Sequence, residues 1–341
     1  MNNHYFISAE ELERTASQLK DVLRGYRIKY DKIETVPGPS VSLYKVFLSP
    51  GVRCSAPRTL EDDIAESMHK KGVRIVTLAD SIGIEIANEK ETRVELCDLL
   101  ESREFHESTA LLPIVLGETF GQTPKVIDLA NAPNILVAGA TKQGKSVCLN
   151  SMVASLLYNK RPKELKLVLI DPKGVEFQVY HDLPSSENRE ISVVTSAVDA
   201  MNVLDGLCSE MNRRYDSTEK HPYIVCFIDE YADLTIPLGD REKKALSRRI
   251  LTDIIMLAQK GLGAGIHLVI ATQRPSKDVI TGLIKANFPT RIAFRTSSRI
   301  DSMTILDVSG AERLLGDGDM LIEQGAEQER VQGGYVSSRK G

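Results

Sequence analysis

The sequence predicts an α/β fold in which a parallel sheet is covered by helices on both faces, preceded by a smaller N-terminal α+β module. Two observations predict it. From about residue 111, short and almost continuously apolar runs alternate with helical segments, which is typical of buried parallel strands. Residues before that point instead mix amphipathic and alternating patterns. We therefore expect an N-terminal domain over residues 1–110 and an α/β domain over residues 111–341.

The N-terminal module is predicted to begin with an amphipathic helix over residues 8–27. Ser8 and Glu11 stand at the spacing of a capping box, and the apolar residues that follow share one helical face. Further along, the pattern predicts a strand over 41–48, a helix over 59–71, and strands over 73–77 and 82–86. The charged segment 101–108 is expected to form a hinge between the modules.

The strands predicted for the α/β domain are apolar along their whole length, so both faces of the sheet should be buried. They cover residues 134–139, 165–171, 223–229, 266–271 and 291–294.

Composition excludes some classes of protein. A net charge of −4 argues against a wholly basic nucleic-acid coat protein, although a local basic surface remains compatible with it. The five cysteines are scattered without a CxxC pair, which indicates a reducing compartment and no zinc site. No run approaches the roughly 18 apolar residues of a membrane helix. We expect a soluble, cytoplasmic chain.

A phosphate-binding P-loop follows the strand at 134–139 and precedes a helix that begins near Lys145. Its glycines allow a tight turn that points backbone amides at phosphates, Lys145 reaches the β and γ oxygens, and Ser146 is a ligand for Mg²⁺. The sequence thus predicts that the chain binds a nucleoside triphosphate with Mg²⁺. The expected nucleotide-binding residues are Gly139, Ala140, Thr141, Lys142, Gln143, Gly144, Lys145, Ser146 and Val147.

Two carboxylates end the apolar strand at 223–229. Asp229 is expected to hold the Mg²⁺ shell, and Glu230 to orient and activate the attacking water. The strand at 266–271 leads into Thr272, Gln273 and Arg274. A polar side chain here, Gln273 or Thr272, would lie between the P-loop and the carboxylates and sense the γ-phosphate. The predicted catalytic residues are therefore Lys145, Asp229, Glu230 and Gln273.

These stretches make the chain similar to the motor domain of the FtsK/SpoIIIE family of DNA translocases. The resemblance covers about 300 residues, and the run from 265 to 321 is far more specific than a P-loop. Other matching stretches are Gly139–Ser146, Leu169–Lys173 with Glu176, and Asp229–Asp233 with Leu234. The first third resembles the α subdomain of the family, and the remainder resembles its RecA-like β subdomain.

The resemblance implies a ring of identical subunits, usually a hexamer, that is threaded by double-stranded DNA and driven by ATP hydrolysis between neighbours. A locally basic segment agrees with this, because residues 271–303 contain six lysines and arginines but only two acidic residues. By position in the family, Arg274 and Lys285 fall in one pore loop and Arg299 in the other, so these are the expected DNA contacts. Arg291 and Arg295 alternate along a strand and fit contacts between subunits equally well.

The chain departs from the family at two positions. Leu262 stands where relatives usually carry an arginine that reaches the neighbour's nucleotide, and such a finger contributes about 1,000-fold or more in rate. We expect slow hydrolysis, or substitution by Lys260, Arg248 or Arg249. Met303 stands where relatives often carry arginine in the second pore loop, so DNA grip is expected to be weaker.

Two alternatives remain open at this point: a secretion-type ATPase that moves polypeptide, and an ATP-binding structural subunit with weak turnover. Contact with a membrane is expected only through a region absent from this chain.

Overall fold

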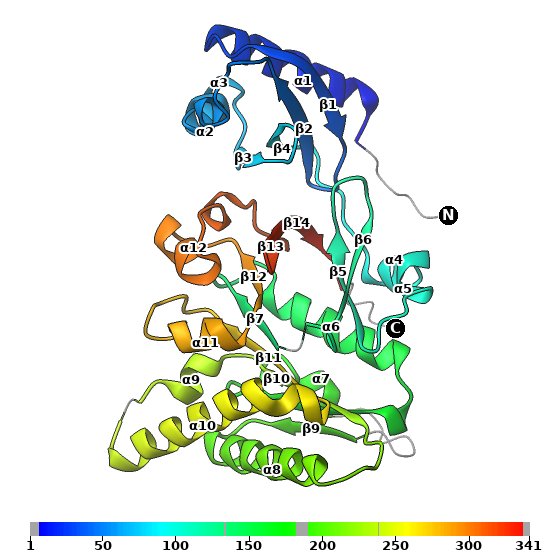
Figure 1. Cartoon of the computed structure of the whole chain (residues 1–341), viewed down its shortest axis with the longest axis vertical. Helices are drawn as coiled ribbons and strands as arrows, with labels where there is room; N and C mark the ends of the chain where they lie inside the picture. Colours follow the sequence, from blue (N-terminus) through cyan, green and yellow to red (C-terminus); the bar gives the residue numbers. More distant parts are fainter. Residues whose placement is uncertain (1–6, 133, 182–189, 238, 337–341) are drawn as a thin grey trace.

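The computed structural model describes residues 7–132, 134–181, 190–237 and 239–336 (Figure 1). Its strands form two separate sheets, one of four strands and one of ten. The strands of the smaller sheet lie between residues 30 and 87, and those of the larger sheet between 113 and 333. The expected division at residue 110 stays a prediction. None of the described helices combines the length and apolar character needed to cross a membrane.

The N-terminal module is an antiparallel sheet, in the order β1-β2-β4-β3, against which one long helix packs. Leu19 and Leu23 of that helix, α1, are fully buried in a cluster with Tyr44, Val46 and Ile84 of the sheet. The elements are α1 (Ala9–Gly25), β1 (Tyr30–Val36), β2 (Val41–Leu48), α2 (Ser55–Arg58), α3 (Glu61–Ser67), β3 (Arg74–Thr77) and β4 (Ile82–Ala87).

Several predictions for this module are confirmed, and three need correction. The helix predicted over 59–71 exists as α3 but is shorter, covering Glu61–Ser67. It ends there because His69, at φ 52°, cannot continue it, and a separate short helix, α2, precedes Thr59. The capping box forms only in part. Ser8 accepts from the Glu11 amide, but the Glu11 carboxylate accepts from the Glu89 amide rather than closing the box.

The segment 101–108, expected to be a hinge, contains helix α5 (Arg103–His106). It is packed rather than extended, because Phe105 is 1% exposed and lies in a cluster with Leu96 and Leu99 of α4 (Leu96–Leu100) and with Val115.

The larger sheet has the order β6-β5-β14-β13-β12-β7-β11-β10-β8-β9. Within the described residues, the strands from β12 to β9 are mutually parallel, whereas the other four add in antiparallel fashion beyond β12. The strands are β5 (Pro113–Glu118), β6 (Pro124–Asp128), β7 (Asn134–Ala138), β8 (Leu165–Ile170), β9 (Glu190–Val194), β10 (Tyr223–Ile228), β11 (Ile266–Thr272), β12 (Thr290–Phe294), β13 (Asp319–Gln324) and β14 (Glu327–Gly333).

The five predicted apolar runs are confirmed as β7, β8, β10, β11 and β12. The sequence did not predict β5, β6, β9, β13 and β14, which are less continuously apolar and lie at the two ends of the sheet. The remaining helices of this sheet are α6 (Lys145–Asn159), α7 (Gln178–His181), α8 (Ala197–Tyr215), α9 (Tyr231–Thr235), α10 (Arg241–Lys260), α11 (Gly282–Asn287) and α12 (Arg299–Leu306), with 3₁₀ turns at Pro162–Glu164, Gly261–Ala264 and Ala311–Arg313.

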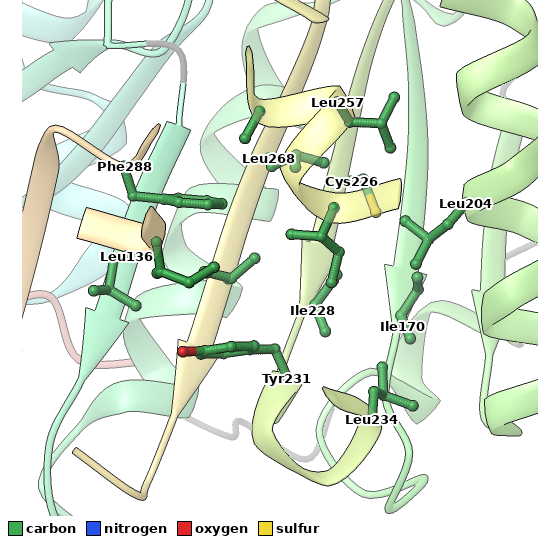
Figure 2. Close-up of a cluster of buried hydrophobic side chains, with 14 of the residues drawn as sticks. Leu136, Ile170, Leu204, Cys226, Ile228, Tyr231, Leu234, Leu257, Leu268 and Phe288 are labelled. Atoms are coloured by element: carbon green, nitrogen blue, oxygen red, sulfur yellow. The ribbon is translucent and has the colours of Figure 1, made fainter. Parts of the chain in front are cut away.

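Both faces of the parallel strands are covered, as the apolar runs predicted. Leu149, Met152 and Leu156 of α6 are fully buried on one face. On the other face, α8 and α10 pack over the strands, and Figure 2 shows Leu204 and Leu257 beside Cys226 and Ile228. Each fully buried aliphatic side chain stabilises the fold by about 1.5–3 kcal/mol. The core therefore fixes the parallel strands, and with them the edge at which they end.

A buried charge network joins the two sheets. Arg330 of β14 donates to both oxygens of Asp319 and, at 2.8 Å, to Glu85 of the smaller sheet. Arg74 pairs with the same Glu85 at 2.9 Å. Burial opposes the charged form of Arg330, but Asp319 and Glu85 outweigh it, so its pKa is raised. Each charge in this network has a partner of opposite sign, which is the condition for burying it at tolerable cost.

Removing Arg330 should therefore destabilise the protein strongly. Arg330→Ala leaves the carboxylates of Glu85 and Asp319 short of a buried partner, and we expect the free energy of unfolding to fall by about 3–5 kcal/mol in urea denaturation. Arg103→Ala, which removes an exposed i,i+4 pair with Glu107, is the control and should change the midpoint little. Equal midpoints for the two variants would contradict this account of the junction.

Candidate functional site

The carboxyl ends of the central parallel strands meet at one edge of the larger sheet. Ala138, the last residue of β7, is paired with Thr272 of β11. Ile228 of β10 is paired with Ile270 of β11 and with Ile170 of β8. The loops that follow these strands therefore start close together, although they are far apart in the sequence.

The P-loop occupies the end of β7, and its glycines are required by close neighbours. A Cβ on Gly139, which has φ 159°, would lie 2.7 Å from the Phe294 Cβ. A Cβ on Gly144, which has φ 112°, would lie 2.7 Å from the Gly318 Cα. The loop is also anchored by two backbone bonds, from Ala140 N to Arg295 O and from Gly318 N to Gln143 O. Helix α6 begins at Lys145, as predicted.

The predicted catalytic lysine and the predicted metal carboxylate are in direct contact. Lys145 Nζ lies 2.8 Å from Asp229 Oδ1 and 3.0 Å from the Asp229 carbonyl oxygen. The two side chains are 3% and 1% exposed, so this ion pair is almost completely buried. The arrangement holds the ammonium group at the point where α6 starts, facing the end of β10.

Glu230 is held by the strand next to it. Its carboxylate accepts from Thr272 Oγ1 at 2.6 Å and from the Gln273 backbone N–H at 2.9 Å. The Gln273 side chain in turn accepts from Thr141 Oγ1 of the P-loop at 2.9 Å. Gln273 thus lies between the P-loop and the carboxylates, where the sequence placed it, and its backbone and side chain link the two.

Lys173 is a member of this constellation to which the sequence assigned no role. Its ammonium lies 3.9 Å from Glu230 Oε2 and 3.6 Å from Asp233 Oδ2. The fully buried Asp171 carboxylate accepts from five successive backbone amides, those of Lys173 to Phe177, and so fixes the loop that carries Lys173. The Leu169–Lys173 stretch was one of those that resemble the family, so the sequence did mark this loop. Only the fold shows that Lys173 lies near the carboxylates of Glu230 and Asp233.

A cavity of about 520 Å³ opens beside the P-loop. Such a volume lies within the range of about 300–1,000 Å³ typical of small-molecule sites. Its lining includes P-loop residues Ala140–Lys142 and Gly144–Val147, together with Gln273. Seven of the nine predicted nucleotide-binding residues therefore line a cavity of suitable size, whereas Gly139 and Gln143 are not in its lining. One of the seven, Lys145, is paired with the buried Asp229.

The three predicted DNA contacts lie in different surroundings. Arg274 is half exposed, and its guanidinium lies 3.6 Å from Asp233, beside the carboxylate site. Lys285 pairs with Asp307 at 2.5 Å and is 22% exposed. Its hydrogen bond lowers the pKa of Asp307, against a smaller opposing effect of burial. Arg299 is exposed at the start of α12 and lines a second cavity, of about 1,100 Å³, between the two sheets.

Two further arginines of the basic segment bind within their own chain. Arg291 pairs with Asp307 and Glu323 and is 14% exposed. Arg295 lies one residue beyond β12 and donates to the Leu315 carbonyl.

Leu262 lies in the 3₁₀ turn before β11 and is 51% exposed. Among the residues considered as substitutes for an arginine finger, Arg249 pairs with Asp205 and Asp253 of its own chain. Arg248 and Lys260 have exposed side chains.

The chain was compared with models of protein families and with known proteins. A model described as the FtsK/SpoIIIE family matches residues 95–221 and 216–277, and one described as the FtsK alpha domain matches residues 1–88. A "DNA translocase FtsK" of Haemophilus influenzae is 38% identical, over 98% of this chain and 70% of the relative. "DNA translocase SftA" of Bacillus subtilis is 41% identical, over 95% of this chain and 36% of the relative. The chain thus spans well under half the length of the second.

Solved structures agree on the fold. The pCW3 conjugation coupling protein TcpA, in a monomer form with ATPγS, is 22% identical with a TM-score of 0.66 and covers 96% of both chains. The cytoplasmic domain of the Thermomonospora curvata type VII secretion ATPase EccC is 21% identical with a TM-score of 0.58, over 73% of this chain and 33% of that one. The expected α/β, RecA-like P-loop ATPase fold is confirmed, and the chain belongs to the FtsK/SpoIIIE family.

Proposed function

We propose that this chain is an ATP-driven motor that moves double-stranded DNA through a ring of identical subunits. The observation that carries the proposal is the convergence at the sheet edge. A buried lysine–aspartate pair, Lys145 and Asp229, lies beside a glutamate fixed by two hydrogen bonds, next to a cavity lined by the P-loop. These are the groups that hydrolysis of a nucleoside triphosphate requires.

Each residue has a role in this proposal that follows from its position. Lys145 brings a positive charge to the start of α6, where the backbone amides of the helix also favour an anion. Glu230 accepts a proton from the attacking water, while Thr272 and the Gln273 amide keep its carboxylate oriented. Lys173 offsets part of the negative charge of Glu230 and Asp233. Gln273 hydrogen-bonds to both Glu230 and Thr141, so a movement of the P-loop would change the position of the Glu230 carboxylate.

Ser146 and Asp229 fit Mg²⁺, because hydroxyl and carboxylate oxygens are the ligands this ion prefers. The ion would neutralise charge on the phosphates during transfer. Ser146 and Lys145 line the cavity, and Asp229 is paired with Lys145.

DNA as the substrate is supported by the relatives, which are named DNA translocases and are 38% and 41% identical. Likeness to the secretion ATPase EccC, at 21% identity, concerns the fold alone. Of the three candidate DNA contacts, we propose Arg299 as the main one, because its side chain is exposed, whereas Lys285 is paired with Asp307 and Arg274 with Asp233. Such a contact neutralises a phosphate without reading a base.

Two substitutions separate binding from chemistry. We expect Lys145→Ala to abolish ATP binding, since it removes the phosphate-binding cation. Glu230→Gln should bind ATP normally but lose about 10²–10⁴-fold in turnover, since it removes the base. Isothermal titration with ATP and Mg²⁺, and phosphate release with and without duplex DNA, measure both. Glu104→Gln, an exposed position on α5, is the control.

Wild-type turnover in Glu230→Gln would exclude Glu230 as the base. ATP turnover that is the same with and without duplex DNA would contradict the proposal that the chain is a DNA motor.

The exposed Leu262 predicts an incomplete site between subunits. If an arginine finger belongs there, Leu262→Arg should raise DNA-stimulated kcat, by up to about 1,000-fold where no other cation serves. Steady-state ATPase at saturating ATP measures this, and Leu111→Arg, a leucine of similar exposure outside the basic segment, is the matched control. Fast and equal turnover in the wild type and Leu262→Arg would show that hydrolysis does not lack a finger.

A further inference from the structure

The cavity beside the P-loop extends to residues that no nucleotide motif contains. Besides the P-loop, it is lined by Ser40, by the segment 91–94 and by Gly333–Tyr335 at the end of β14. The segment 91–94 connects the N-terminal sheet to the rest of the chain. One continuous cavity therefore joins the phosphate-binding loop to the junction between the two sheets.

Two of these lining side chains, those of Arg93 and Tyr335, are exposed and contact each other. The Arg93 guanidinium carbon lies 4.8 Å from the centroid of the Tyr335 ring, in a cation–π contact. Tyr335 is 41% exposed. Its backbone is fixed on both sides, because its N–H donates to Val94 O at 2.6 Å and its carbonyl accepts from Leu96 N at 3.0 Å. The ring is thus positioned by its backbone without being buried.

We propose that Tyr335 and Arg93 bind the base of the nucleotide whose phosphates the P-loop holds. The inference rests on the proposed function, because it assumes that a nucleoside triphosphate occupies this cavity. Phosphates anchored at Lys145 leave the sugar and base to fill the remainder of the cavity, whose lining includes Tyr335 and Arg93.

The chemistry around Tyr335 and Arg93 suits a base better than a phosphate. Glu91, two residues before Arg93 in the sequence, also lines the cavity, and a carboxylate repels phosphate oxygens. Aromatic rings and guanidinium planes both stack on bases, whichever base is present. Of the two aromatic residues in the lining that the structure describes, Phe294 is fully buried beneath the P-loop glycines, whereas Tyr335 offers ring surface. A purine, with the larger ring system, should bind more tightly here than a pyrimidine.

Calorimetry with ATP and with inorganic tripolyphosphate tests the inference, because the second probe has phosphates but no base. We expect Tyr335→Ala to weaken ATP binding about tenfold and to leave tripolyphosphate binding unchanged. Tyr335→Phe should bind ATP like the wild type, since it keeps the ring. Tyr26→Ala is the matched control, because Tyr26 is 40% exposed and lies outside the cavity lining. Thermal unfolding of each variant checks that it is folded.

The outcomes separate this inference from the proposed function. Equal ATP affinity in the wild type and folded Tyr335→Ala would overturn the base site while leaving the motor intact. An equal loss for both probes would also overturn it, since Tyr335 would then act through the shape of the P-loop. A wild-type chain that binds neither probe would refute the proposed function itself, and the base site with it. Weaker binding of CTP than ATP, lost in Tyr335→Ala, would support stacking directly.

Discussion

The alignment of the parallel strands β7, β11, β10 and β8 is the constraint on which the site depends. Their hydrogen-bonded register brings Ala138, Thr272, Ile228 and Ile170 to one edge, and each is followed by a loop with a polar role. Lys145 follows β7 and can meet Asp229, which follows β10 and is 84 residues away, because only β11 separates these two strands in the sheet. The apolar core on both faces of the sheet holds this register. The packing that stabilises the fold therefore also positions the residues of the site.

The site is also connected to the junction between the sheets. The Gly318 N–H donates to the Gln143 carbonyl of the P-loop, and the Gly333 N–H donates to the Gly318 carbonyl. Tyr335, two residues on, bonds to Val94 in the connection to the N-terminal sheet. The Cβ clash at Gly144 shows how closely the 314–321 stretch approaches the P-loop. In the proposed motor, this path would let nucleotide binding act on the position of the N-terminal module.

Much of this could be predicted from the sequence, because the informative signals are local. An apolar run, a glycine-rich turn and a carboxylate at a strand end each fit within a few residues, so β7, β10, β11 and the start of α6 were predicted. Contacts between side chains that are far apart in the sequence could not be predicted. Lys173 facing Glu230, Lys285 pairing with Asp307, and Arg330 joining Glu85 to Asp319 all depend on which segments become neighbours. The antiparallel strands β13 and β14 were missed because charged side chains interrupt their apolar pattern.

Triplex displacement from linear duplex DNA tests the central claim most directly, because it requires assembly, hydrolysis and directed movement together. The account predicts that the purified protein removes the third strand when ATP and Mg²⁺ are present, and does not when Glu230 is replaced by glutamine. ATP hydrolysis stimulated by DNA, with no displacement at any protein concentration, would contradict translocation and leave a DNA-responsive ATPase that does not move along its substrate.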